Sequence, residues 1–231
     1  MSASLLRAWS VHLYTALGAV VGLIAILAIN SGNFRQAFWL MGLAVVIDAT
    51  DGTLARFARV KELITWFDGD RLEDIIDYLN YVVVPCLLLL RADLLPSQDA
   101  VWIASLPLLA SAYGFCQKEA KTADHYFLGF PSYWNVVTFY LYVLNTPVWV
   151  NAFVIIFLSI MVFVPIRYIY PSRSPRFRAL TNILGALWGA ALLIMIYRLP
   201  DPPRALVFAS LAFPAYYTCL SLWLVLRRPA R

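Results

Sequence analysis

The stretch that decides the fold runs Asp48-Ala-Thr-Asp51-Gly52-Thr-Leu-Ala55-Arg56, continues through residues 57–68, and ends in Gly69-Asp-Arg-Leu-Glu73-Asp-Ile-Ile-Asp77. Its carboxylates lie at the ends of two strongly apolar segments. An ionisable side chain at membrane depth is costly, so it usually faces a polar cavity and has a function. The stretch therefore predicts a functional site at the boundary of a membrane-embedded helix bundle.

The rest of the chain is as apolar as the segments beside these carboxylates. Of the 231 residues, 62% are hydrophobic and only 13% are charged, which is more apolar surface than a soluble domain can bury. We therefore predict an all-α polytopic membrane protein. About eight transmembrane helices are expected, in the apolar stretches 11–30, 35–55, 73–92, 100–117, 131–145, 147–169, 178–198 and 203–226.

Three regions are expected along the chain. Residues 1–10 place Leu5, Leu6 and Trp9 around Arg7, a pattern typical of a short amphipathic helix at the membrane interface. Residues 11–226 show no repeat and no water-soluble segment, so we expect a single transmembrane domain. Residues 227–231 form a short basic tail.

The cations of the chain are unevenly distributed between the loops. If the N-terminus is cytoplasmic, 14 of the 18 Lys and Arg residues lie on the cytoplasmic side; the exceptions are Arg35, Arg91, Arg198 and Arg204. The positive-inside rule then places both termini and the carboxylates at the cytoplasmic face. The net charge of +5 is explained by this topology and by anionic lipid headgroups, so no nucleic-acid partner is expected.

The acidic residues share helix faces. Asp48 and Asp51 are three residues apart, and Glu73 and Asp77 are four apart, so each pair projects from one side of a helix. If the two helices pack antiparallel, the four carboxylates meet, and such close like charges need compensation. Carboxylate oxygens favour Mg²⁺ or Mn²⁺, and two such ions are the usual arrangement for displacement at phosphorus. We therefore predict two divalent ions.

The residues next to these acids suit a phosphate-bearing ligand. Gly52 allows a ligand to approach the backbone, and Ala55 keeps the next turn of the same face open. Arg56 offers a guanidinium fork that matches phosphate oxygens. The sequence therefore predicts a pocket for a metal-bound diphosphate.

Two other interpretations of the acids were weighed. They could form ordinary salt bridges with the cations beside them, Arg56, Arg59, Lys61 and Arg71, although the full spacing makes this the weaker interpretation. They could also carry a divalent cation across the membrane. A transporter, however, is expected to place acids at mid-span in both halves of the chain, whereas these acids are confined to 48–77.

The stretch resembles the signature of the CDP-alcohol phosphotransferases, membrane enzymes that transfer a phosphatidyl or similar group from a CDP-linked donor to an alcohol. The twelve-residue gap at 57–68 is longer than in most of that family and resembles the variant of bacterial phosphatidylcholine synthases. Further similar segments are His12-Leu-Tyr14-Thr15, Ile75-Ile76-Asp77-Tyr78 with Pro85 after it, Phe130-Pro131-Ser132-Tyr133-Trp134-Asn135, Pro165-Ile-Arg167-Tyr168 and Pro171-Ser172-Arg173.

The resemblance implies a role for each matching residue. It makes residues 11–226 a catalytic domain in a bacterial inner membrane, and it is the only basis for expecting a homodimer. Two Mn²⁺ or Mg²⁺ ions would be held by Asp48, Asp51, Glu73 and Asp77. The CDP group would be bound by Asp48, Asp51, Gly52, Ala55, Arg56 and Gly69. Asp77 would also be the catalytic base.

The third acid departs from the family pattern, in which this position is normally Asp. Either Glu73 still reaches the metal, or Asp74 takes its place. Asp74 lies about 100° further round the helix, so Glu73 is the favoured ligand.

The reaction implied is transfer of the phosphatidyl group from CDP-diacylglycerol to choline, with release of CMP. Aromatic faces bind quaternary ammonium groups such as choline, and the candidates are Tyr78, Tyr81, Tyr126, Tyr133 and Trp134. Candidates for holding the lipid phosphate are Arg167 and Arg173. Glycerol 3-phosphate, serine and inositol phosphate remain alternative acceptors, although an anionic acceptor would need extra cations in the pocket.

Overall fold

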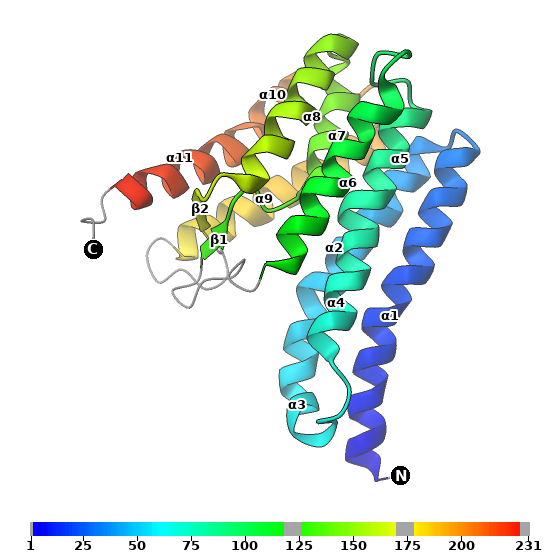
Figure 1. The fold of residues 1–231 in the computed structure, drawn as a ribbon, viewed down its shortest axis with the longest axis vertical. Helices are drawn as coiled ribbons and strands as arrows, with labels where there is room; N and C mark the ends of the chain where they lie inside the picture. The colour runs from blue at the N-terminus through cyan, green and yellow to red at the C-terminus, as the bar shows by residue number, and fades with distance from the viewer. Residues whose placement is uncertain (1, 118–125, 170–177, 227–231) are drawn as a thin grey trace.

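A computed structural model describes residues 2–117, 126–169 and 178–226, which form an elongated bundle of helices (Figure 1). The first half of the bundle contains α1 (Ala3–Asn30), α2 (Phe34–Phe57), α3 (Val60–Leu63), α4 (Gly69–Asp77), the π-helix η1 (Tyr78–Val83), α5 (Val84–Arg91) and α6 (Ala100–Cys116). The second half contains β1 (Tyr126–Leu128), α7 (Trp134–Leu144), α8 (Val148–Phe163), β2 (Arg167–Ile169), α9 (Arg178–Tyr197), α10 (Arg204–Ser210) and α11 (Ala212–Leu226).

The all-helical membrane class is confirmed, with one local exception. Within the described residues, β1 and β2 pair antiparallel, with Phe127 opposite Tyr168. Four helical segments of the described chain are long and apolar enough to cross a membrane: Ala3–Asn30, Phe34–Phe57, Ala179–Tyr197 and Arg204–Trp223. Shorter apolar helices are Ala100–Cys116, Trp134–Leu144 and Val148–Phe163. The number of eight spans therefore stays a prediction.

Residues 3–10 are the first turns of a longer helix and not a short helix of their own, while their position at the membrane interface stays a prediction. Helix α1 begins at Ala3, where Ser2 caps it by accepting a hydrogen bond from the Leu5 amide, and continues unbroken to Asn30. Its first turns pack against the chain that follows α2, in an apolar cluster formed by Ala8, Val11, Ala58, Val60 and Ile64. This protein partner for the apolar face explains why the helix continues.

The predicted third span is a continuous helix that changes its hydrogen-bonding pattern part of the way along. Helix α4 passes into η1, where the Val84 amide donates to the Leu79 carbonyl five residues earlier, and then into α5. Pro85, at the start of α5, has no amide hydrogen to donate to the Tyr81 carbonyl as a regular α-helix requires. This missing donor gives a physical reason for the π-helix, a feature that is frequent at functional sites.

Helix α1 packs closely against α4 and η1. A Cβ added at Gly18 would lie 2.5 Å from Cγ2 of Ile76, so only glycine permits this approach. The buried Asn80 side chain donates to the Gly18 carbonyl across the interface at 3.0 Å. In membranes such interhelical hydrogen bonds contribute about 0.6 kcal/mol on average. The contact fixes the register between α1 and the helix that carries Glu73 and Asp77.

Candidate metal centre

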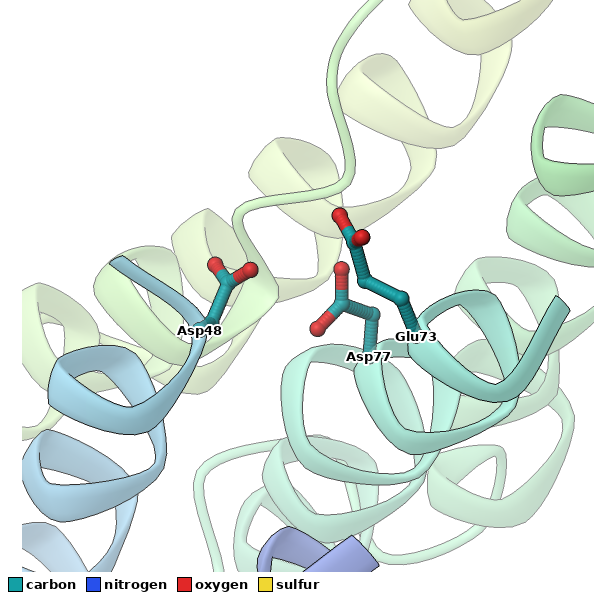
Figure 2. Close-up of side chains that lie close together, drawn as sticks. All are labelled: Asp48, Glu73 and Asp77. Atoms are coloured by element: carbon teal, nitrogen blue, oxygen red, sulfur yellow. The ribbon is translucent and has the colours of Figure 1, made fainter. Parts of the chain in front are cut away.

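Three of the four predicted metal ligands point toward one another in the structure. Asp48 on α2 faces Glu73 and Asp77 on α4 (Figure 2), and one carboxylate oxygen from each lies within 4.8 Å of the others. All three side chains are half-buried. Two oxygens on one Mg²⁺ ion lie at most about 4.2 Å apart, twice the metal–oxygen distance. A small side-chain movement therefore suffices for the set to bind a divalent ion, and the donors are the hard oxygens that such ions prefer.

Asp51 is buried beside this group rather than within it. It lines a small cavity together with Asp48 and Asp77, and its Oδ2 accepts a hydrogen bond of 2.8 Å from the Thr15 hydroxyl. Only 5% of Asp51 is exposed. Because Thr15 belongs to α1, that helix orients the fourth carboxylate. The grouping includes Glu73 and not Asp74 among the described residues.

Tyr81 contacts the carboxylate cluster through its hydroxyl group. The hydroxyl donates to Oδ2 of Asp48 at 2.7 Å, and the ring lines the same cavity as Asp77. Sequence reasoning selected Tyr81 as a choline ligand and did not find this hydrogen bond. Tyr81 lies in η1, a change of helix type that the sequence analysis did not predict.

The other aromatic candidates are divided between the site and the core. Tyr133 interacts electrostatically with Tyr81 and is hydrogen-bonded to Tyr217. In contrast, Trp134 is fully buried in the core, where its indole N–H donates to Ser111 at 2.8 Å. The Tyr78 hydroxyl donates to the Leu108 carbonyl. The structure thus brings Tyr133 near the acids by way of Tyr81 and gives Trp134 a packing role.

Three of the remaining predicted residues lie where the structure gives no side-chain information. Tyr126 and Arg167 belong to β1 and β2, whose backbones are described while these two side chains are not. Arg173 lies outside the described residues. Their roles at the choline and lipid-phosphate sites stay predictions.

The predicted CDP-binding residues continue from the acids toward the α3 end of the bundle. At Gly52 a Cβ would meet only the Arg56 guanidinium, at 3.7 Å. Arg56 is exposed and donates to the Thr53 hydroxyl at 2.9 Å, while Ala55 packs against the cluster between α1 and α3. Gly69 is the first residue of α4 and lies directly beside the His12 ring.

Three polar residues around the site received no role from the sequence. Thr15 and Asn80 line the cavity, and His12 lies one turn before Thr15 on α1. The sequence could have indicated Asn80, because it is a polar residue in an apolar stretch and follows Asp77 by three positions. His12 and Thr15 belong to a segment that matched the family, but the residues alone did not indicate what they contact.

Comparison with known proteins shows the family. No protein-family model matches the chain. A phosphatidylcholine synthase of Legionella pneumophila is 39% identical over 223 residues, which cover 94% of this chain and 88% of the relative. The phosphatidylcholine synthase of Pseudomonas aeruginosa is 34% identical, over 94% of this chain and 91% of the relative. That of Agrobacterium fabrum is 32% identical, over 93% and 89%. With such relatives matched along nearly their whole length, the chain belongs to the phosphatidylcholine synthase family.

Proposed function

We propose that the protein transfers the phosphatidyl group of CDP-diacylglycerol to choline and so forms phosphatidylcholine and CMP. The observation that carries the proposal is the convergence of Asp48, Glu73 and Asp77 in a chain whose relatives bear the name phosphatidylcholine synthase. Carboxylates of this kind suit a metal-assisted reaction at phosphorus. The name of the relatives supports choline as the acceptor.

Two Mn²⁺ or Mg²⁺ ions are part of the proposal. Their ligands would be the three converging carboxylates and the adjacent Asp51, all of which supply oxygen. Bound ions would neutralise the diphosphate and stabilise the departing CMP. Thr15 and Tyr81 hold Asp51 and Asp48 through hydrogen bonds, and such partners of metal ligands commonly tune metal affinity.

Asp77 is the proposed catalytic base. The choline oxygen forms a bond to the lipid-linked phosphorus, and its proton passes to the Asp77 carboxylate. The bond from that phosphorus to the bridging diphosphate oxygen breaks, and its electron pair leaves with CMP. Arg56, with Gly52 and Ala55 on the same helix, would bind the CDP phosphates.

Choline would be held by the tyrosines nearest the carboxylates. Tyr81 and Tyr133 interact with each other beside Asp48, and aromatic rings next to a carboxylate attract a quaternary ammonium group. We leave Trp134 out of the proposed site because it is fully buried with its N–H already bonded. Arg167 and Arg173 remain the proposed partners of the lipid phosphate.

The proposed setting is a bacterial inner membrane, with both termini and the active site on the cytoplasmic side. The distribution of Lys and Arg supports this orientation. A diacyl donor also favours a site at the membrane boundary, since its tails can stay in lipid while the CDP head reaches the carboxylates. A homodimer is proposed on family resemblance alone.

The decisive experiment is CMP release by the purified protein in detergent with CDP-diacylglycerol and Mn²⁺. We expect release to depend on choline and not on serine or glycerol 3-phosphate. Asp77→Asn should abolish turnover and largely spare CDP-diacylglycerol binding. Release with another alcohol in place of choline would reassign the acceptor, and full activity of Asp77→Asn would remove this residue as the base.

A further inference from the structure

His12 combines burial with an unused hydrogen-bonding atom. Only 7% of the residue is exposed. Its Nε2 atom is buried and finds no hydrogen-bond partner in the part of the chain that the structure describes. Buried polar atoms nearly always have a partner, and an exception at a functional site calls for an explanation. A phenylalanine would fill a purely structural position here without leaving a nitrogen unpaired.

The His12 ring is held firmly in place by its neighbours. Its centroid lies 4.6 Å from that of Phe67 and 5.7 Å from that of Trp9, which meets it edge-on. On a third side the ring reaches Gly69, where an added Cβ would lie only 2.7 Å from Cε1 of His12. Glycine at position 69 is therefore needed to accommodate the ring, and the imidazole cannot easily turn away to find another partner.

The position of His12 connects it with the proposed site. On α1 it lies three residues before Thr15, which shares its helix face and bonds to Asp51. Gly69, against which the ring packs, begins the helix that carries Glu73 and Asp77. Figure 1 shows this end of α1 beside α3 and the start of α4. The ring thus packs against the predicted CDP-binding glycine, one helical turn from the residue that bonds Asp51.

The chemistry of the available ligands identifies a partner. His12 is not among the described groups that could hold a metal. Choline has no N–H, and its single hydroxyl must face phosphorus for the reaction. The hydrocarbon tails of the donor carry no hydrogen-bonding group, and its ester carbonyls can only accept. The nucleotide of the donor has amino, carbonyl, hydroxyl and phosphate groups, and an imidazole nitrogen can pair with any of them as donor or acceptor.

We infer that His12 is a positioning residue that hydrogen-bonds the nucleotide of the CDP-linked donor through Nε2. The inference rests on the proposed function, since it takes the CDP group as the ligand of this site. Trp9, Phe67 and Gly69 hold the ring in the orientation that the bond requires. His12 then contributes to donor binding and not to activation of choline.

The test compares His12→Phe, which keeps a ring and removes the nitrogens, with His12→Gln, whose amide reaches about as far as Nε2. CDP binding in the presence of Mn²⁺ is measured by calorimetry, and KM and kcat are measured from CMP release. For His12→Phe we expect about tenfold weaker CDP binding and about a tenfold higher KM for CDP-diacylglycerol, the effect of one lost hydrogen bond. The KM for choline should not change, and His12→Gln should recover part of the loss.

Tyr14→Phe is the matched control on the same helix, because it removes a hydroxyl already paired with Thr50 at 2.8 Å. It should bind CDP as the wild type does. Equal CDP affinity of wild type and His12→Phe would overturn the inference alone. A wild type that binds CDP but releases no CMP with choline would overturn the proposed function, and the His12 comparison would still hold. A wild type that does not bind CDP would overturn both.

Discussion

At the scale of single residues, the Tyr81 hydroxyl is the first group to test. It donates to Asp48, so Tyr81→Phe removes the hydrogen bond to a proposed metal ligand while the aromatic ring stays in place. We expect the Mn²⁺ concentration for half-maximal CMP release to rise about tenfold. The KM for choline should change less, because the ring face is retained.

Tyr78→Phe is the control for this substitution. It deletes a hydroxyl that bonds the Leu108 carbonyl and leaves Asp48 untouched, so its Mn²⁺ dependence should match the wild type. An unchanged Mn²⁺ dependence in Tyr81→Phe would show that the hydrogen bond to Asp48 does not tune the site.

Glu73 tests whether the departure from the family pattern matters. The structure groups Glu73 with Asp48 and Asp77 and leaves out Asp74. Glu73→Gln should therefore raise the Mn²⁺ requirement beyond the roughly 10- to 100-fold expected for loss of an outer-shell partner. Asp74→Asn removes the same charge one residue away and should keep a nearly normal requirement, as measured by Mn²⁺ titration of CMP release. The reverse order of effects would make Asp74 the ligand.

The carboxylates could be predicted from the sequence because helical spacing alone places acids three or four residues apart on one face. Their partners could not. Thr15 reaches Asp51 from another helix, and Tyr81 bonds Asp48 from a π-helical segment that the sequence did not indicate. Trp134 shows the opposite limit: the aromatic residues expected near the acids were candidates for a choline cage, and the structure places this one in the hydrophobic core.

At the scale of elements, we expect Pro85 to determine the helix type of the third span and so the direction of its side chains. Pro85→Ala restores an amide hydrogen that can bond the Tyr81 carbonyl, so the α-helical pattern would compete with η1. A change in helix type there would turn Tyr81 away from Asp48. We expect at least about tenfold lower CMP release. The Tm in detergent should fall much less than the activity, because the substitution changes the site and not the packing of the whole bundle.

Pro107→Ala is the matched control, since Pro107 is also buried inside a helix, α6, and does not line the carboxylate cavity. It should keep the wild-type activity and Mn²⁺ dependence. Full activity of Pro85→Ala would show that η1 is not needed to position Tyr81.

Element boundaries were predictable where the chain carries clear signals. The turns after Asn30 and before Arg204 coincide with Gly or Pro residues, and the apolar stretches contain helices near their expected positions. The continuity of α1 through residues 3–10 was not predictable, because it depends on an apolar partner, the segment around Val60 and Ile64, that lies far along the chain. Amphipathic spacing alone cannot distinguish a membrane surface from a protein surface.

At the scale of the whole molecule, the two ends of the bundle differ in the segments that they carry. Figure 1 shows the connections after α1 and α5 at one end, and α3 with the N-terminus at the other. The carboxylates lie between the middle of the bundle and the α3 end, on helices that carry Arg56 and Arg71 toward that end. The distribution of Lys and Arg in the sequence and the packing that brings the acids together therefore point to the same end of the bundle as the candidate active end.

That agreement predicts which end faces the cytoplasm. In a variant without its native cysteines, Glu62→Cys introduces an exposed thiol in α3, and Ser97→Cys introduces one at the connection between α5 and α6. The positive-inside rule predicts that a membrane-impermeant thiol reagent added to spheroplasts labels only the cysteine at position 97. Inverted vesicles should reverse the result, with the cysteine at 62 labelled. Labelling of position 62 in spheroplasts would place the carboxylates on the outer side and exclude a site supplied with cytoplasmic choline.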